Sequence, residues 1–177
     1  MARDILKTLK TEHNTLRELF KKMEDTTDRA EKGRAELLAK IEANLMPHAK
    51  WEEAVFYPAF KERADRDGLK THAEALLEHA SVENTVIPNV KASEVTTPEF
   101  AGRVKVFGEM IEHHAKEEET TMFKMARQMF SAEELARMDE EYEAWKASPA
   151  AANAVAGAEA KSGVKAFAQK VGDTLSR

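Results

Sequence analysis

Residues 48–53 have the sequence HAKWEE, and residues 114–119, which stand 66 positions later, have the sequence HAKEEE. The same offset of 66 pairs the Glu-His dipeptides at residues 12–13 and 78–79. Four of the six histidines therefore stand in two sets with the same internal spacing, which indicates an internal repeat. Each copy is predicted to be a helical hairpin that supplies one histidine from its first helix and a His-x3-Glu motif from its second.

Apolar residues around these motifs recur at helical spacing, which predicts long amphipathic helices. Leu69, Leu76 and Leu77 are expected to lie on the inward face of the third helix, and Pro47 is expected to kink the second. Thr97 precedes a proline and is expected to cap the fourth. Four long helices with short connections predict an all-α fold, an up-down-up-down four-helix bundle. The apolar stripes that indicate these helices span residues 5–23, 37–60, 69–90 and 100–129.

A fifth, shorter helix is predicted after the bundle, because Ser131 and Glu134 form a capping box. Beyond Pro149 the sequence is rich in alanine, and a weak amphipathic stripe runs from Val164 to Leu175. We expect this tail to be a mobile appendage, a helix that covers a groove of the bundle, or a contact to a second subunit; the oligomeric state stays open. The predicted domains are a bundle over residues 1–147, with repeats at about 5–64 and 69–130, and a tail over residues 148–177.

The composition narrows the classes of protein to which the chain can belong. Its 177 residues suffice for one compact domain, and 7 glycines and 5 prolines are too few for the turns of a many-stranded sheet. The 27 basic and 32 acidic residues give a formal charge of −5, so we expect no nucleic-acid partner and no anionic membrane surface. No apolar run approaches the roughly 20 residues of a membrane span, which favours a soluble cytoplasmic protein. Because the chain has no cysteine, histidine and carboxylate side chains must hold any metal ion.

Six polar side chains of the two repeats fall on predicted inward faces, where each would cost several kcal/mol of folding free energy without a partner. A single histidine on such a face is usually a hydrogen-bonded core residue, but the repeated His-x3-Glu spacing, which places both side chains on one face, favours a metal site. Four imidazoles and two carboxylates exceed the ligands of one tetrahedral zinc. They suit two first-row ions, with both carboxylates bridging and two histidines on each ion, and two iron ions with an oxo or hydroxo bridge fit best. The predicted ligands are His13, His48, Glu52, His79, His114 and Glu118.

Several neighbouring residues are predicted not to be ligands. His113 points about 100° away from its neighbour around the helix, so we expect it to face solvent. His72 lies about 10 Å from His79 along the axis of the same helix, which is too far to bind the same ion, and we expect it to be partly exposed. Glu53, Glu83 and Glu119 are expected either to face solvent or to orient ligands from outside the centre. Tyr57 is expected to pack in the core, with a hydrogen bond to a bound oxygen ligand as the alternative. Core packing is also expected for Met46, Met122, Met125 and Met129.

Residues 48–58, HAKWEEAVFYP, match the pattern His-x3-Glu-Glu followed by an aromatic residue and proline, which is typical of the hemerythrin-like proteins with HHE cation-binding domains. The chain resembles this family over about residues 5–145, and the resemblance implies a non-haem di-iron centre in a four-helix bundle. The family's respiratory oxygen carriers have a fifth histidine at the position of Ala75. The ligand set is therefore more similar to the branch with four histidines and two glutamates, which includes iron-centre repair proteins and typically handles iron, nitric oxide or peroxide.

Three functions remain open on the sequence. The chain could bind oxygen, nitric oxide or peroxide, which we place first; it could be an enzyme that decomposes peroxide or reduces nitric oxide; or it could store or donate iron for the repair of iron centres. The ligand types serve all three, because access, outer hydrogen bonds and redox potential decide between them. We also expect the metal-free protein to be less stable, with Glu52 or Glu118 taking up a proton.

Overall fold

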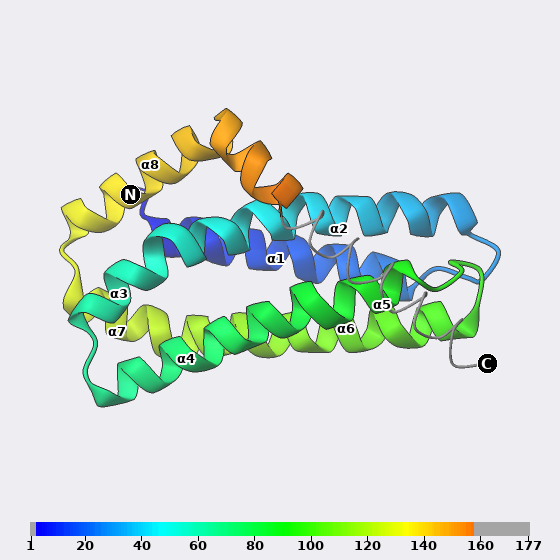
Figure 1. The fold of residues 1–177 in the computed structure, drawn as a ribbon, viewed down its shortest axis with the longest axis horizontal. Helices are drawn as coiled ribbons and strands as arrows, with labels where there is room; N and C mark the ends of the chain where they lie inside the picture. The colour runs from blue at the N-terminus through cyan, green and yellow to red at the C-terminus, as the bar shows by residue number, and fades with distance from the viewer. Residues whose placement is uncertain (1–2, 158–177) are drawn as a thin grey trace, which may run out of the picture.

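Long helices run side by side through the molecule, as Figure 1 shows. The computed structural model describes residues 3–157, and within this range it contains no strand, which confirms the all-α prediction. The α-helices are α1 (Ile5–Glu24), α2 (Glu31–Trp51), α3 (Tyr57–Arg63), α4 (Arg66–Ser81), α5 (Ile87–Lys91), α6 (Pro98–Glu117), α7 (Phe123–Met129) and α8 (Ala132–Lys146). Short π-helical segments at Glu52–Phe56, Val82–Val86 and Glu118–Met122 join α2 to α3, α4 to α5 and α6 to α7.

These joined segments and α1 form the four long rods of a helical bundle. The side chains of Asp4, Asp65 and Thr97 each accept a hydrogen bond from a backbone N–H in the first turn of the helix that follows, which stabilises the starts of α1, α4 and α6. Pro47 lies inside α2, which continues through it to Trp51. The predicted four-helix bundle is therefore confirmed.

Two of the π-helical segments begin at the glutamates of the two His-x3-Glu motifs. The Tyr57 N–H donates to the carbonyl of Glu52, and the Phe123 N–H donates to the carbonyl of Glu118, so each bond spans five residues instead of the four of an α-helix. Segments of this kind are frequent at functional sites. The two π-helical segments therefore begin at corresponding positions of the 66-residue repeat.

Two apolar clusters fill the bundle, one on each side of the level at which the His-x3-Glu motifs lie. Both are composed of side chains that are almost fully buried, so the motifs lie between two dry regions. The first cluster includes Leu16, Phe20, Ile41, Leu45, Val104 and Phe107. The second includes Ile5, Leu9, Phe56, Phe60, Met122 and Ala126.

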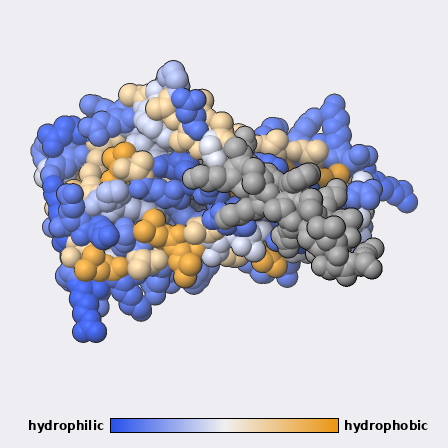
Figure 2. Space-filling view, viewed as in Figure 1, coloured by the Kyte–Doolittle hydropathy of each residue, from blue (hydrophilic) through white to orange (hydrophobic). Residues whose placement is uncertain are grey.

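The inward face of α4 differs from the prediction. Leu69, Leu76 and Leu77 are 43%, 38% and 69% exposed, while His72 and His79 are buried. The space between α4 and its neighbours is filled by the imidazoles and by small side chains, so the leucines lie outward, and Figure 2 shows apolar surface in the region of α4. The prediction that these leucines face inward is wrong, because hydrophobicity alone does not locate a face that carries polar ligands.

The segment after the bundle begins as expected. The Ser131 side chain accepts from the Glu134 N–H, and the Glu134 side chain accepts from the Ser131 N–H, which confirms the capping box at the start of α8. Residues 149–157 are again helical; Ala151 is buried, and Val155 packs against the first apolar cluster. The amphipathic stripe expected between 164 and 175 lies outside the described residues. Within residues 3–157, no helix combines the length and the apolar character needed to cross a membrane.

A chain that ends at Ser148 is expected to keep its full metal content. None of the predicted ligands lies beyond this residue, and the truncation leaves α8 complete. The loss of the buried Ala151 and of the Val155 contact is expected to lower the free energy of unfolding by about 1–2 kcal/mol, measured by urea denaturation. Metal loss on truncation would show that the segment after Ser148 completes the bundle.

Candidate metal centre

Four histidines from four helices meet in two facing pairs at the middle of the bundle. The Nε2 atoms of His13 on α1 and His48 on α2 are 3.2 Å apart, and those of His79 on α4 and His114 on α6 are 3.0 Å apart. All four side chains are buried. Two nitrogens bound side by side to one ion, at about 2.1 Å each, lie about 3 Å apart. Each pair therefore has the spacing of two ligands of one metal ion.

Glu52 lies between the two histidine pairs. Its Oε1 atom is 3.1 Å from His48 Nε2 and its Oε2 atom is 3.6 Å from His79 Nε2. The side chain is fully buried. Since one oxygen faces each pair, this carboxylate has the placement of a bridge between two ions.

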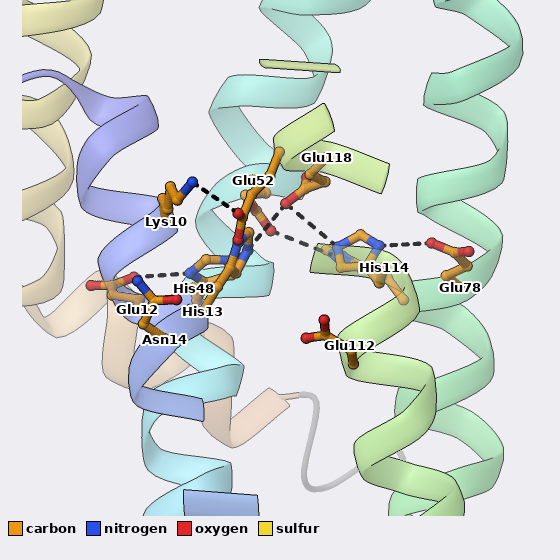
Figure 3. A network of polar contacts seen from close by, with 12 residues as sticks. Lys10, Glu12, His13, Asn14, His48, Glu52, Glu78, Glu112, His114 and Glu118 are labelled. Carbon is orange, nitrogen blue, oxygen red and sulfur yellow. Dashed lines mark hydrogen bonds and ion pairs between the residues drawn. The ribbon is translucent and has the colours of Figure 1, made fainter. Parts of the chain in front are cut away.

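Glu118 occupies the corresponding position in the second repeat. Its Oε2 atom is 3.2 Å from His13 Nε2 and 3.7 Å from His114 Nε2, and Figure 3 shows it beside Glu52. This carboxylate therefore also contacts both histidine pairs. The structure brings together all six of the side chains that the sequence singled out as ligands.

The chemistry of these donors fits a pair of cations. Within residues 3–157, the only buried side-chain nitrogen or oxygen atoms that make no hydrogen bond are both carboxylate oxygens of Glu52 and Oε2 of Glu118. A buried charged oxygen without a donor costs several kcal/mol, and a metal ion bound to it compensates this cost. Among the described residues, the two fully buried groups that could hold an ion are His13, His48, Glu52 and Glu118, and Glu52, His79 and His114.

Tyr57 also enters the centre. Its hydroxyl donates to Glu118 Oε1 at 2.8 Å and lies 3.2 Å from His79 Nε2. Burial raises the pKa of this hydroxyl well above its usual value, and the charge of Glu118 raises it further, so Tyr57 stays a donor. The predicted core packing of Tyr57 is confirmed, and the contact of its hydroxyl with Glu118 is an addition to it. The internal repeat could have indicated a special role for this hydroxyl, because the residue that corresponds to Tyr57 in the second repeat is Phe123, which has none. The Phe123 ring stacks on His13.

Each of the four histidines donates from Nδ1 to a second carboxylate. This hydrogen bond fixes the tautomer that leaves Nε2 free to bind a metal and holds the ring in place. Two of the acceptors, Glu12 and Glu78, were not predicted. For the other two, Glu53 and Glu119, the outer-partner role that was left open beside solvent exposure is the one that the structure shows. The contacts are His48 to Glu12 at 2.9 Å, His114 to Glu78 at 2.7 Å, His79 to Glu53 at 3.1 Å and His13 to Glu119 at 3.1 Å.

The charges of the metal-free centre shift the pKa values of several of its residues. Burial alone would lower the pKa of His48, but the carboxylates of Glu52 and Glu12 raise it to about 10. Burial would raise the pKa of Glu118, but the neighbouring His114 and other imidazoles lower it. The lowered pKa favours the charged form of Glu118. The carboxylates that His114 contacts raise its pKa as well, so protons are favoured on His48 and His114. The expectation that at least one of the two carboxylates takes up a proton stays a prediction.

The residues around the centre that were predicted not to be ligands occupy different environments. His113 is 64% exposed, as predicted, and its Nε2 atom lies 3.4 Å from Glu78 Oε1. His72, expected to be partly exposed, is buried edge-on against the Tyr57 ring. Glu83 forms an ion pair with Lys50. The methionines pack in or against the apolar clusters: Met46, Met122, Met125 and Met129.

A cavity of about 30 Å³ lies against the histidine pairs. Its lining includes all four imidazoles and the apolar side chains of Leu16, Val82 and Ile111. Such a volume exceeds the minimum for one water molecule, roughly 10–15 Å³. The cavity therefore offers a small molecule an apolar space directly beside the Nε2 atoms.

Comparison with known proteins agrees with this geometry. The model of the hemerythrin HHE cation-binding domain matches residues 4–126. The fold is similar to the crystal structure of a hemerythrin HHE cation binding domain-containing protein from Mycobacterium kansasii, with a TM-score of 0.73 and 21% identity over 93% of this chain and 97% of that one. A curated protein of Nostoc sp. named DNA nickase is 25% identical over 143 residues, which are 81% of this chain but only 39% of that protein. Because the family model covers more than half of its residues, the chain belongs to the hemerythrin HHE cation-binding domain family.

Proposed function

We propose that this protein holds two iron ions in the candidate metal centre and uses them to bind a small oxidant ligand, namely oxygen, nitric oxide or peroxide. The observation that carries the proposal is a pair of buried carboxylates, three of whose four oxygens accept no hydrogen bond, set between two facing pairs of imidazoles. Imidazole and carboxylate ligands suit iron. Two bound iron ions would supply the electrons with which such a ligand is bound or reduced.

The residues around the centre support a role with small ligands. The cavity beside the imidazoles has room for a small molecule, and apolar side chains form part of its lining. The Tyr57 hydroxyl orients Glu118 from the side of the second histidine pair. The four outer carboxylates hold the imidazoles with their Nε2 atoms directed at the centre.

Two measurements test the proposal. Metal analysis is expected to give two irons per chain, and one tightly bound zinc per chain would contradict it. The anaerobically reduced protein is then exposed to oxygen. A coloured spectrum that reverses when oxygen is removed supports ligand binding, whereas immediate irreversible oxidation favours the alternatives, a redox enzyme or an iron store or donor.

Metal uptake by the metal-free protein is expected to become stronger as the pH rises. The pKa of His48 is raised to about 10, so its imidazole carries a proton at neutral pH that a metal ion must displace. Below this pKa each unit of pH is expected to strengthen binding about tenfold through this one proton. Titration with Zn²⁺ between about pH 6 and 9 measures how the zinc affinity changes with pH. Glu12→Gln removes one of the charges that raise the pKa of His48 and is expected to weaken this pH dependence. A pH-independent affinity would contradict the prediction.

Tyr57→Phe is expected to destabilise the metal-free protein by about 1.5–3 kcal/mol. The substitution keeps the buried ring and removes the donor of a hydrogen bond to the charged, buried Glu118. The free energy of unfolding from urea denaturation measures the effect, and circular dichroism checks that the helices are retained. An unchanged free energy of unfolding would show that the hydroxyl contributes nothing to the position of Glu118.

A further inference from the structure

Helix α8 lies beyond the residues that the family model matches, yet two of its side chains bind an outer carboxylate of the candidate metal centre. The Tyr142 hydroxyl donates to Glu12 Oε2 at 2.7 Å, and Lys146 Nζ donates to Glu12 Oε1 at 2.8 Å. Glu12 Oε2 in turn accepts from His48 Nδ1 at 2.9 Å. A continuous chain of hydrogen bonds thus runs from α8 through Glu12 to His48.

The two donors are held rigidly. The Tyr142 ring is fully buried and packs against Trp51, with ring centroids 4.8 Å apart, and Lys146 Nζ lies 4.3 Å from the centre of the Tyr142 ring. Trp51 belongs to α2, three residues after His48. Asp139, also on α8, accepts a hydrogen bond from the Thr8 hydroxyl of α1. The donors therefore have a fixed position relative to both helices of the first hairpin.

In the second half of the centre, the outer carboxylate of His114 has no such pair of donors among the described residues. Glu78, the counterpart of Glu12 in the repeat, accepts from His114 Nδ1 at 2.7 Å. Its other oxygen lies 3.4 Å from Nε2 of the exposed His113. Among the described residues, α8 has no counterpart in the other half, because the 66-residue repeat ends with α7. Glu12 and Glu78 therefore differ in the donors that hold them. The other two outer carboxylates are held in both halves, Glu119 by Arg17 at 2.8 Å and Glu53 by Lys50 at 2.8 Å.

We propose that Tyr142 and Lys146 are positioning residues for the half of the centre formed by His13 and His48, and that a metal ion in this half is released more slowly than one in the half formed by His79 and His114. The inference rests on one part of the proposed function, namely that each half of the centre binds a metal ion. Both donors keep the Glu12 carboxylate in place, and Glu12 keeps the His48 ring in the orientation that presents Nε2. Outer partners of this kind typically change metal affinity 10–100-fold.

The test uses the full chain loaded with Zn²⁺, which binds the same ligand types and requires no iron chemistry. Release of zinc to an excess of chelator is followed in time, and two phases are expected. Tyr142→Phe keeps the ring against Trp51 and removes only the hydroxyl, so we expect it to accelerate the slower phase about tenfold and to leave the faster phase unchanged. Lys146→Met is expected to act on the same phase. Glu78→Gln is the matched control and is expected to accelerate the faster phase.

A second measurement reports on position and not on overall stability. In zinc-loaded protein labelled with ¹⁵N-histidine, Tyr142→Phe is expected to shift the Nδ1–H resonance of His48 and to leave that of His114 in place. Equal acceleration of both release phases, a single phase in the unmodified chain, or an unshifted His48 resonance would overturn the proposal. Absence of iron from the purified protein would count against the proposed function alone, since the zinc measurements do not depend on it.

Discussion

Replacing His114 with alanine is expected to remove at least one metal ion per chain, whereas replacing the adjacent His113 is expected to leave the metal content at two. His114 is buried, and its Nε2 atom lies 3.0 Å from that of His79, so its loss leaves one imidazole where two are needed. His113 is 64% exposed and points away from the centre. Metal analysis after gel filtration measures both contents.

The pair of variants is a matched comparison, because both remove one imidazole from the same turn of α6. Circular dichroism is expected to show the same helical content in both, which separates metal loss from unfolding. The reverse result, loss of metal in His113→Ala with retention in His114→Ala, would mean that the repeat is displaced by one residue. It would also contradict the placement of the four imidazoles described above.

Removal of the metal ions is expected to lower the melting temperature by roughly 8–16 °C. An ion present at about a thousand times its dissociation constant stabilises the folded state by about 4 kcal/mol, and each kcal/mol corresponds to about 2–4 °C in a chain of this size. The metal-free protein is expected to remain helical, because the two apolar clusters on either side of the centre stay buried. Protonation of His48 partly compensates the charges of Glu52 and Glu118.

Calorimetric scans with and without chelator measure this difference. The His114→Ala variant is the control, since it lacks an intact centre and is expected to respond less to the chelator. Equal melting temperatures of the metal-loaded and metal-free chains would contradict the prediction. Such a result would mean that the centre contributes no binding energy to the fold.

Helical periodicity and the 66-residue repeat predicted the bundle and the six inner residues of the candidate centre. A helix rises by a fixed amount per residue, so equal spacings from His13 to His48 and from His79 to His114 bring the four imidazoles to one level once each hairpin closes. The i, i+4 spacing puts each glutamate on the same face as its histidine. Local signals also located the caps at Thr97 and Ser131.

The pairing of each inner residue with its outer partner depends on contacts between helices that are far apart in the sequence. The Nδ1 partner of His13 is Glu119, 106 residues away, and the hydroxyl on Glu12 comes from Tyr142, 130 residues away. Periodicity predicts which residues share one face of a helix. The residues that this face contacts depend on the orientation of each helix about its own axis in the bundle. That orientation is set by side-chain packing over the whole bundle and by the π-helical segments, which no local pattern indicated. For the same reason the outward position of Leu76 and the contact of α8 with the metal centre required the folded chain.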